Sequence, residues 1–206
     1  MSTSAAPSPG PFADPTALGL FGLSIGCASL LPLAFGVKAA MAPDALRAAA
    51  LFCLLFGAGC QFLAGVMSFA NKNGLGGTLL TPFSFNWVMN WWVLTEYAAG
   101  RPPSATVLLA VDVCFLVIFV VMTAAFGYFS RLLFVFLLDI DALYVLRVAR
   151  EVLHAPSLGL GVALATLVLM GISLYIAFSL VLANASGRQL LPLGGPLFKA
   201  APPPST

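Results

Sequence analysis

Long apolar runs alternate with short polar segments along almost the whole chain. Six such runs can be distinguished, and each is near the ~20 residues that an α-helix needs to cross the hydrocarbon core of a bilayer. They cover residues 17–37, 46–70, 77–98, 105–126, 131–150 and 157–183. Because backbone groups in lipid must be hydrogen-bonded within their own segment, we predict that all six runs are transmembrane helices.

The segments between the runs are too short to hold a separate soluble domain. We therefore predict an all-α, polytopic membrane protein in which six transmembrane helices form one bundle over residues 14–194. The ends of the chain, 1–13 and 195–206, are rich in proline and small residues and have no long apolar run. Such segments cannot bury enough apolar surface to fold, so both are predicted to be disordered tails.

Composition supports the bilayer as the solvent of this chain. Of its 206 residues, 61% are hydrophobic and 8% are charged, whereas soluble domains carry about 25% charged residues. The net charge of +2 is too small to indicate a nucleic-acid partner. Membrane lipids are the expected surroundings.

Three stretches resemble one family, the acetate uptake transporters, which comprise the bacterial acetate/succinate permeases and their fungal relatives. The stretch DPTALGLFGL (14–23) resembles the opening of that family's first helix. The stretch QFLAGVMSFANKNGLGGTLLTPFSFNW (61–87) resembles its second helix end, loop and aromatic re-entry. The stretch GISLYIAFSLVLANASGRQLLPLG (171–194) resembles its last helix and the Gly-Arg-x-x-Leu-Pro-x-Gly tail.

The resemblance implies a multi-pass protein of the plasma or inner membrane that assembles with itself, as a ring-shaped homo-hexamer with one pathway in each protomer. It implies transport of acetate or similar small monocarboxylates, through an anion channel or by symport with protons. In the family the pathway narrows at an apolar constriction, which falls here on Leu23, Phe83 and Ile140. Apolar constrictions gate by dewetting.

The chain also departs from the family pattern. Asp14 replaces an asparagine in the opening, Ser68 and Asn184 stand where glutamates are usual, and Asp139 and Asp141 occupy positions of small hydroxyl residues. The fold is therefore implied more strongly than the substrate.

Polar residues inside the runs are the candidates for substrate binding. Asn86 and Asn90 are four residues apart and share a helix face, where they form a polar stripe or hydrogen-bond to a neighbouring helix. Gln61 lies in the second stretch that resembles the family. It either lines the pathway or hydrogen-bonds to a neighbouring helix. Thr78 and Thr81 precede Pro82, where a helix start would direct free N–H groups at an anion or would simply be capped.

Asp139 and Asp141 lie in an otherwise apolar run and are candidates for a proton relay. Two residues apart, they point about 200° apart on a helix, so they cannot both line one pathway. An unpaired carboxyl in apolar surroundings tends to stay protonated. We expect one of them to border the pathway beside Ile140 and the other to pack against a neighbouring helix or protomer, unless both only pair with basic or amide groups. Asp112 is a possible third member.

No catalytic motif is present, so the chain is not expected to be an enzyme. The four cysteines and the single histidine have no metal-binding spacing, so neither a metal nor another cofactor is expected. Two alternatives to carboxylate transport stay open. One is a channel for a small neutral solute such as urea or an amide, and the other is a membrane scaffold or assembly protein whose pathway is sealed.

Overall fold

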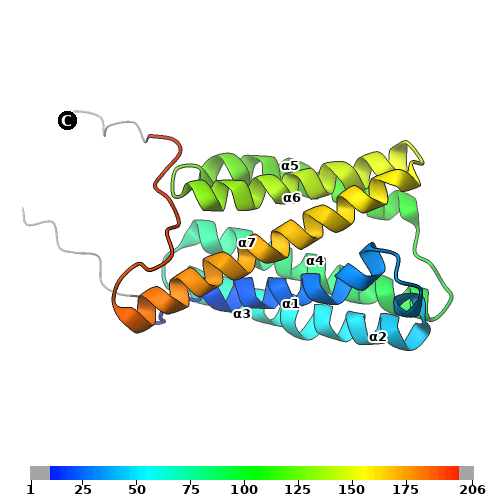
Figure 1. Ribbon diagram of the computed structural model, residues 1–206, viewed down its shortest axis with the longest axis horizontal. Helices are drawn as coiled ribbons and strands as arrows, with labels where there is room; N and C mark the ends of the chain where they lie inside the picture. The colour runs from blue at the N-terminus through cyan, green and yellow to red at the C-terminus, as the bar shows by residue number, and fades with distance from the viewer. Residues whose placement is uncertain (1–9, 200–206) are drawn as a thin grey trace, which may run out of the picture.

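The computed structural model describes residues 10–199, which fold into helices without a β-strand in that range (Figure 1). Six long rods cross the molecule, and the second of them consists of three consecutive segments. The helical segments are α1 (Thr16–Ala34), α2 (Pro43–Phe52), a π-helical turn η2 (Cys53–Ala58), α3 (Gly59–Ala70), α4 (Gly74–Ala98), α5 (Ala105–Phe126), α6 (Arg131–Val152) and α7 (Gly159–Ser186). Short 3₁₀ turns, η1 (Lys38–Met41) and η3 (Pro156–Leu158), precede α2 and α7. The predicted runs coincide with these rods to within about three residues.

Four of the rods are long and apolar enough to cross a membrane, which makes the chain a membrane protein. They are Thr16–Ala34, Pro43–Ala70, Ala105–Phe126 and Pro156–Ser186. Many of the large apolar side chains on α5 face outward, as expected for a surface in contact with lipid. The other two rods, α4 and α6, have 25 and 22 residues but carry more polar or charged positions, so their assignment as spans stays a proposal.

Helix ends follow local sequence signals. Asn73 caps α4 by accepting a hydrogen bond from the Gly76 N–H at 2.9 Å, and Ser130 caps α6 by accepting from Leu132 N–H at 3.2 Å. Helix α7 ends at Gly187, whose φ of 69° lies in the left-handed region that glycine adopts without steric cost.

The rods pack as pairs around one apolar core. Helices α5 and α6 form an antiparallel pair, α3 packs on α4, and α7 crosses the molecule to lie against both α1 and α6 (Figure 1). Glycines of α1 allow close packing inside the protomer, because a side chain at Gly22 would collide with Cys60 and one at Gly26 with Trp87. Trp87 is also packed against Gly57 of the π-helical turn. The Trp87 ring is therefore held between Gly26 of α1 and Gly57 of η2, where the absence of a side chain lets the backbone come close.

The two ends of the described chain lie against the same end of the bundle. Phe12 N–H donates to the Asn71 side chain at 3.0 Å, at the α3–α4 turn. At the other terminus, Arg131 N–H donates to the Gly195 carbonyl at 2.9 Å and Leu197 N–H to the Gly127 carbonyl at 2.8 Å. Residues 1–9 and 200–206, the greater part of the two predicted tails, lie outside the described residues.

Candidate functional site

Two cavities enter the bundle from opposite ends. The wide cavity has a volume of about 580 Å³ and lies among the C-terminal halves of α1, α4 and α6 and the N-terminal half of α7. The narrow cavity has a volume of about 160 Å³ and lies among the N-terminal halves of α1, α4 and α6, Gln61 of α3 and the C-terminal end of α5. Phe83 lines both cavities. Phe83, near the middle of α4, is thus a lining residue of both the wide and the narrow cavity.

The three residues predicted to form a constriction all lie in the buried core. Leu23 of α1, Phe83 of α4 and Ile140 of α6 are all buried and belong to one apolar cluster. Leu23 lines the narrow cavity, and Ile140 lines neither. The Phe83 ring contacts those of Trp87 and Phe119, with centroids 6.3 Å and 5.1 Å apart. The residue shared by the two cavities, Phe83, therefore belongs to a cluster of buried apolar side chains.

The wide cavity carries most of the polar groups. Asn86 and Asn90 line it from α4, and the Asn90 amide donates to the Asn86 backbone carbonyl at 3.0 Å. Asn86 Oδ1 is buried and accepts no hydrogen bond from residues 10–199. Thr166 lines the cavity from α7, but its hydroxyl donates to the Val162 carbonyl of its own helix at 2.8 Å. The predicted amide stripe does share one face, and that face borders a cavity.

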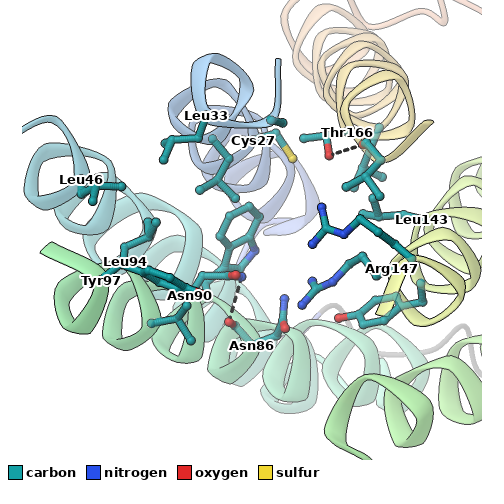
Figure 2. Close-up of a pocket in the computed structure, with 18 of the residues that line it drawn as sticks. Cys27, Leu33, Leu46, Asn86, Asn90, Leu94, Tyr97, Leu143, Arg147 and Thr166 are labelled. Atoms are coloured by element: carbon teal, nitrogen blue, oxygen red, sulfur yellow. Dashed lines mark hydrogen bonds between the residues drawn. The ribbon is translucent and has the colours of Figure 1, made fainter. Parts of the chain in front are cut away.

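Two arginines of α6, Arg147 and Arg150, also line the wide cavity. Figure 2 shows the Arg147 side chain pointing into it, toward Asn86 and Asn90 on the facing helix. Arg147 Nη2 lies 3.0 Å from Asp112 Oδ1 of α5, and its guanidinium carbon lies 5.3 Å from the centroid of the Tyr144 ring. The wide cavity therefore offers amide groups and cationic groups to a solute.

The narrow cavity is almost entirely apolar, with Gln61 as its one deeply buried amide. Gln61 is fully buried, and neither Oε1 nor Nε2 has a hydrogen-bond partner in the described part of the chain. A buried amide without partners is energetically costly, typically about 1–3 kcal/mol. The groups of Gln61 are thus available to a polar solute in this cavity.

Thr78 and Thr81 do not lie where the sequence suggested. Helix α4 begins at Gly74, two turns before Pro82, so the helix start expected near Thr81 is wrong and no free N–H groups are presented there. Thr78 is exposed, and Thr81 packs against Gly65 of α3. Neither threonine lines either cavity.

Asp139 and Asp141 leave α6 in different directions, and neither lines a cavity. Asp141 Oδ2 accepts a hydrogen bond from the Thr123 hydroxyl of α5 at 2.7 Å, which ties the two helices together. Asp139 is half-buried, and its Oδ2 atom has no hydrogen-bond partner in the described part of the chain. We expected one of the two aspartates to border the pathway beside Ile140, but neither lines a cavity. Asp141 instead packs against a neighbouring helix, as the expectation for the second aspartate stated. Asp112 pairs with a basic residue, Arg147.

Arg147 and Tyr144 were not among the site residues predicted from the sequence. A signal was present, because Ile140, Tyr144 and Arg147 follow one another at spacings of four and three residues and share one helix face. An arginine on the same face as a proposed constriction residue points into the bundle rather than into lipid. The helical period would therefore have placed it in the pathway.

No family model and no curated protein sequence matches this chain. A solved structure described as the bacterial acetate channel SatP is similar in fold, with a TM-score of 0.78 over 89% of this chain and 99% of that one, at 20% sequence identity. At this level of identity the likeness concerns the fold. The chain described here therefore has the all-helical fold of that channel protein.

Proposed function

We propose that this protein is a multi-pass channel or proton-coupled transporter for acetate or similar small monocarboxylates in the plasma or inner membrane. The observation that carries the proposal is the pair of cavities entering from opposite ends and sharing Phe83. Such a pair is what a conduit with a closed apolar gate requires. The resemblance of three sequence stretches to the acetate uptake transporters, and the fold shared with a bacterial acetate channel, support the choice of substrate.

In this proposal all six rods cross the membrane, including α4 and α6. Leu23, Phe83 and Ile140 form the closed gate, and Asn86, Asn90 and Gln61 are the polar groups that a solute meets on its two sides. The protomers assemble as a homo-hexamer, and each protomer holds its own conduit. Asn86 and Asn90 of α4 and Arg147 of α6 are tolerated because they line the wide cavity inside the bundle.

The test is flux of radiolabelled acetate into proteoliposomes holding the purified protein. We expect uptake faster than in protein-free liposomes, and a further increase with an inward proton gradient if transport is coupled. Uptake no faster than in protein-free liposomes, measured on protein of the expected oligomeric size, would contradict the proposal. Native mass spectrometry of the same preparation tests the hexamer separately.

A second candidate is a channel for a small neutral solute such as urea or an amide. The specific observation in its favour is that Gln61 and Asn86 hold buried amide oxygens without hydrogen-bond partners, which suits a solute that is both donor and acceptor. Parallel flux assays with acetate and urea distinguish the two. Transport of neither solute would favour the sealed scaffold.

A further inference from the structure

Arg147 of α6 and Asp112 of α5 form a close ion pair. The contact joins one guanidinium nitrogen, Arg147 Nη2, to Asp112 Oδ1 at 3.0 Å. A contact at one nitrogen engages only part of the guanidinium group. Arginine carries five N–H donors in a planar fork, so donors remain for another acceptor.

The surroundings show where those donors can act. Side-chain exposure is 24% for Arg147 and 9% for Asp112, so Asp112 lies on the protein side of the pair and Arg147 on the cavity side. The Tyr144 ring, 5.3 Å below the guanidinium, supports it from α6. That ring stacks on Phe119, which in turn meets Phe83 edge-on. Arg147 is thus positioned by an aromatic stack that leads to the proposed gate.

The balance of charge in the wide cavity favours an anion. Two arginines line it, and the one carboxylate paired with them in the described residues is Asp112. Asn86 and Asn90 face the guanidinium from α4 (Figure 2). A planar carboxylate matches the guanidinium fork in shape as well as in charge.

Resting on the proposed function, we propose that Arg147 is the carboxylate-binding residue of the wide cavity and that Asp112 is its resident counter-ion. In the empty cavity Asp112 compensates the charge of Arg147, which makes a half-buried guanidinium tolerable. An entering carboxylate accepts hydrogen bonds from the Arg147 N–H groups that Asp112 leaves free. It thereby compensates part of the positive charge of Arg147. Asp112 thereby limits how tightly the anion is held, as rapid passage requires.

The test compares two substitutions that break the same ion pair. Equilibrium binding of acetate and of its neutral counterpart acetamide is measured by ligand-observed NMR on the purified full chain. Arg147→Gln should weaken acetate binding about tenfold or more, as for loss of a charged hydrogen-bond partner. Asp112→Asn should tighten it about twofold to fivefold, because it removes a negative charge that competes with acetate for Arg147. Acetamide binding should change little in either variant.

Arg131→Gln is the matched control, because it removes the same charge from the exposed first turn of the same helix, away from both cavities. It should bind acetate like the unsubstituted protein. If the ion pair only holds α5 to α6, both pair variants will change binding in the same direction or not at all, and either result overturns the inference. If Arg147→Gln does not fold, Asp112→Asn decides alone, and unchanged or weaker binding overturns the inference.

Binding and flux separate this inference from the proposed function. Opposite binding effects of the two variants, with no acetate flux in proteoliposomes, would support the anion site and reject transport. Acetate flux with identical kinetics in both variants and in the unsubstituted protein would support transport and reject the role of Arg147.

Discussion

The ring of Phe83 on α4 meets the ring of Phe119 on α5 nearly edge-on, with centroids 5.1 Å apart and planes inclined at 72°. Phe83 also lines both cavities, so this contact closes the space between them from the α5 side. Edge-on aromatic pairs are favourable beyond the area that they bury, by about 0.5–1.5 kcal/mol. The proposed gate therefore depends on a contact that a single substitution can remove.

We predict that Phe83→Ala raises solute flux several-fold and lowers the preference for acetate over larger carboxylates, because the two cavities would join. Flux into proteoliposomes measures both effects. Phe85→Ala is the matched control, since Phe85 lies two residues further along α4 and is 57% exposed. Phe85→Ala should leave flux unchanged. Equal or lower flux in correctly assembled Phe83→Ala protein would contradict the role of Phe83 as a gate.

We predict that Gln61→Leu lowers acetate flux while leaving thermal stability unchanged or higher. The Gln61 amide atoms have no hydrogen-bond partner among the described residues, so an apolar residue of similar size removes a buried unsatisfied group. It also removes the deeply buried amide that lines the narrow cavity. Melting temperature in detergent and flux in proteoliposomes are the two measurements. Ser68→Ala also removes an unpartnered buried group from α3, but one that lines neither cavity, and should affect stability alone. Loss of flux in both variants would point to packing instead.

We predict that Gly57→Ala destabilises the protein by about 1–3 kcal/mol, the usual cost of overpacking. An added methyl group would collide with the Trp87 ring, which is already packed against Gly26. The melting temperature should fall accordingly. Gly171→Ala should not lower it, because a methyl group there meets nothing within 4 Å in the protomer. A melting temperature of Gly57→Ala equal to that of the unsubstituted protein would show that the ring can move aside.

We predict that Asp139→Asn and Asp141→Asn have different effects. Asp141→Asn weakens the hydrogen bond with Thr123 and should lower stability about as much as Thr123→Val, with the double variant little worse than either one, as residues sharing one bond are not additive. Asp139→Asn removes a carboxyl group with an unpartnered oxygen and should leave stability unchanged. If Asp139 relays protons, its variant will also lose any stimulation of flux by a proton gradient. Full retention of that stimulation would remove Asp139 from the proposed relay.

The rods of this fold could be predicted because a helix that crosses a bilayer needs an apolar run of about 20 residues. The π-helical turn at Cys53–Ala58 could not, since nothing in an unbroken apolar run marks one extra residue per turn. Pro82 was misleading because proline often opens a helix, whereas here its ring sits on an exposed position of α4. Membrane helices tolerate such an interruption of the hydrogen-bond ladder.

The candidate site was predicted less completely. The amides Asn86, Asn90 and Gln61 were visible as polar residues in apolar runs, and all three line a cavity. Arg147 was missed because a basic residue near the end of a run looks like an interfacial anchor. Its spacing from Ile140 and Tyr144 was the signal in the sequence, and the contact with Asp112 on another helix shows that it faces the inside of the bundle.

The unequal size of the two cavities has a consequence for direction. In the proposed conduit, a wide cavity with two arginines at one end and a narrow apolar cavity at the other would capture solute from the two compartments with unequal efficiency. Such a conduit would rectify, which means that it would pass acetate more readily down a gradient in one direction than down an equal gradient in the other. Detailed balance means that an asymmetric shape cannot by itself concentrate a solute on one side of the membrane. Accumulation of acetate against its gradient would therefore need energy from a second ion that is transported together with it.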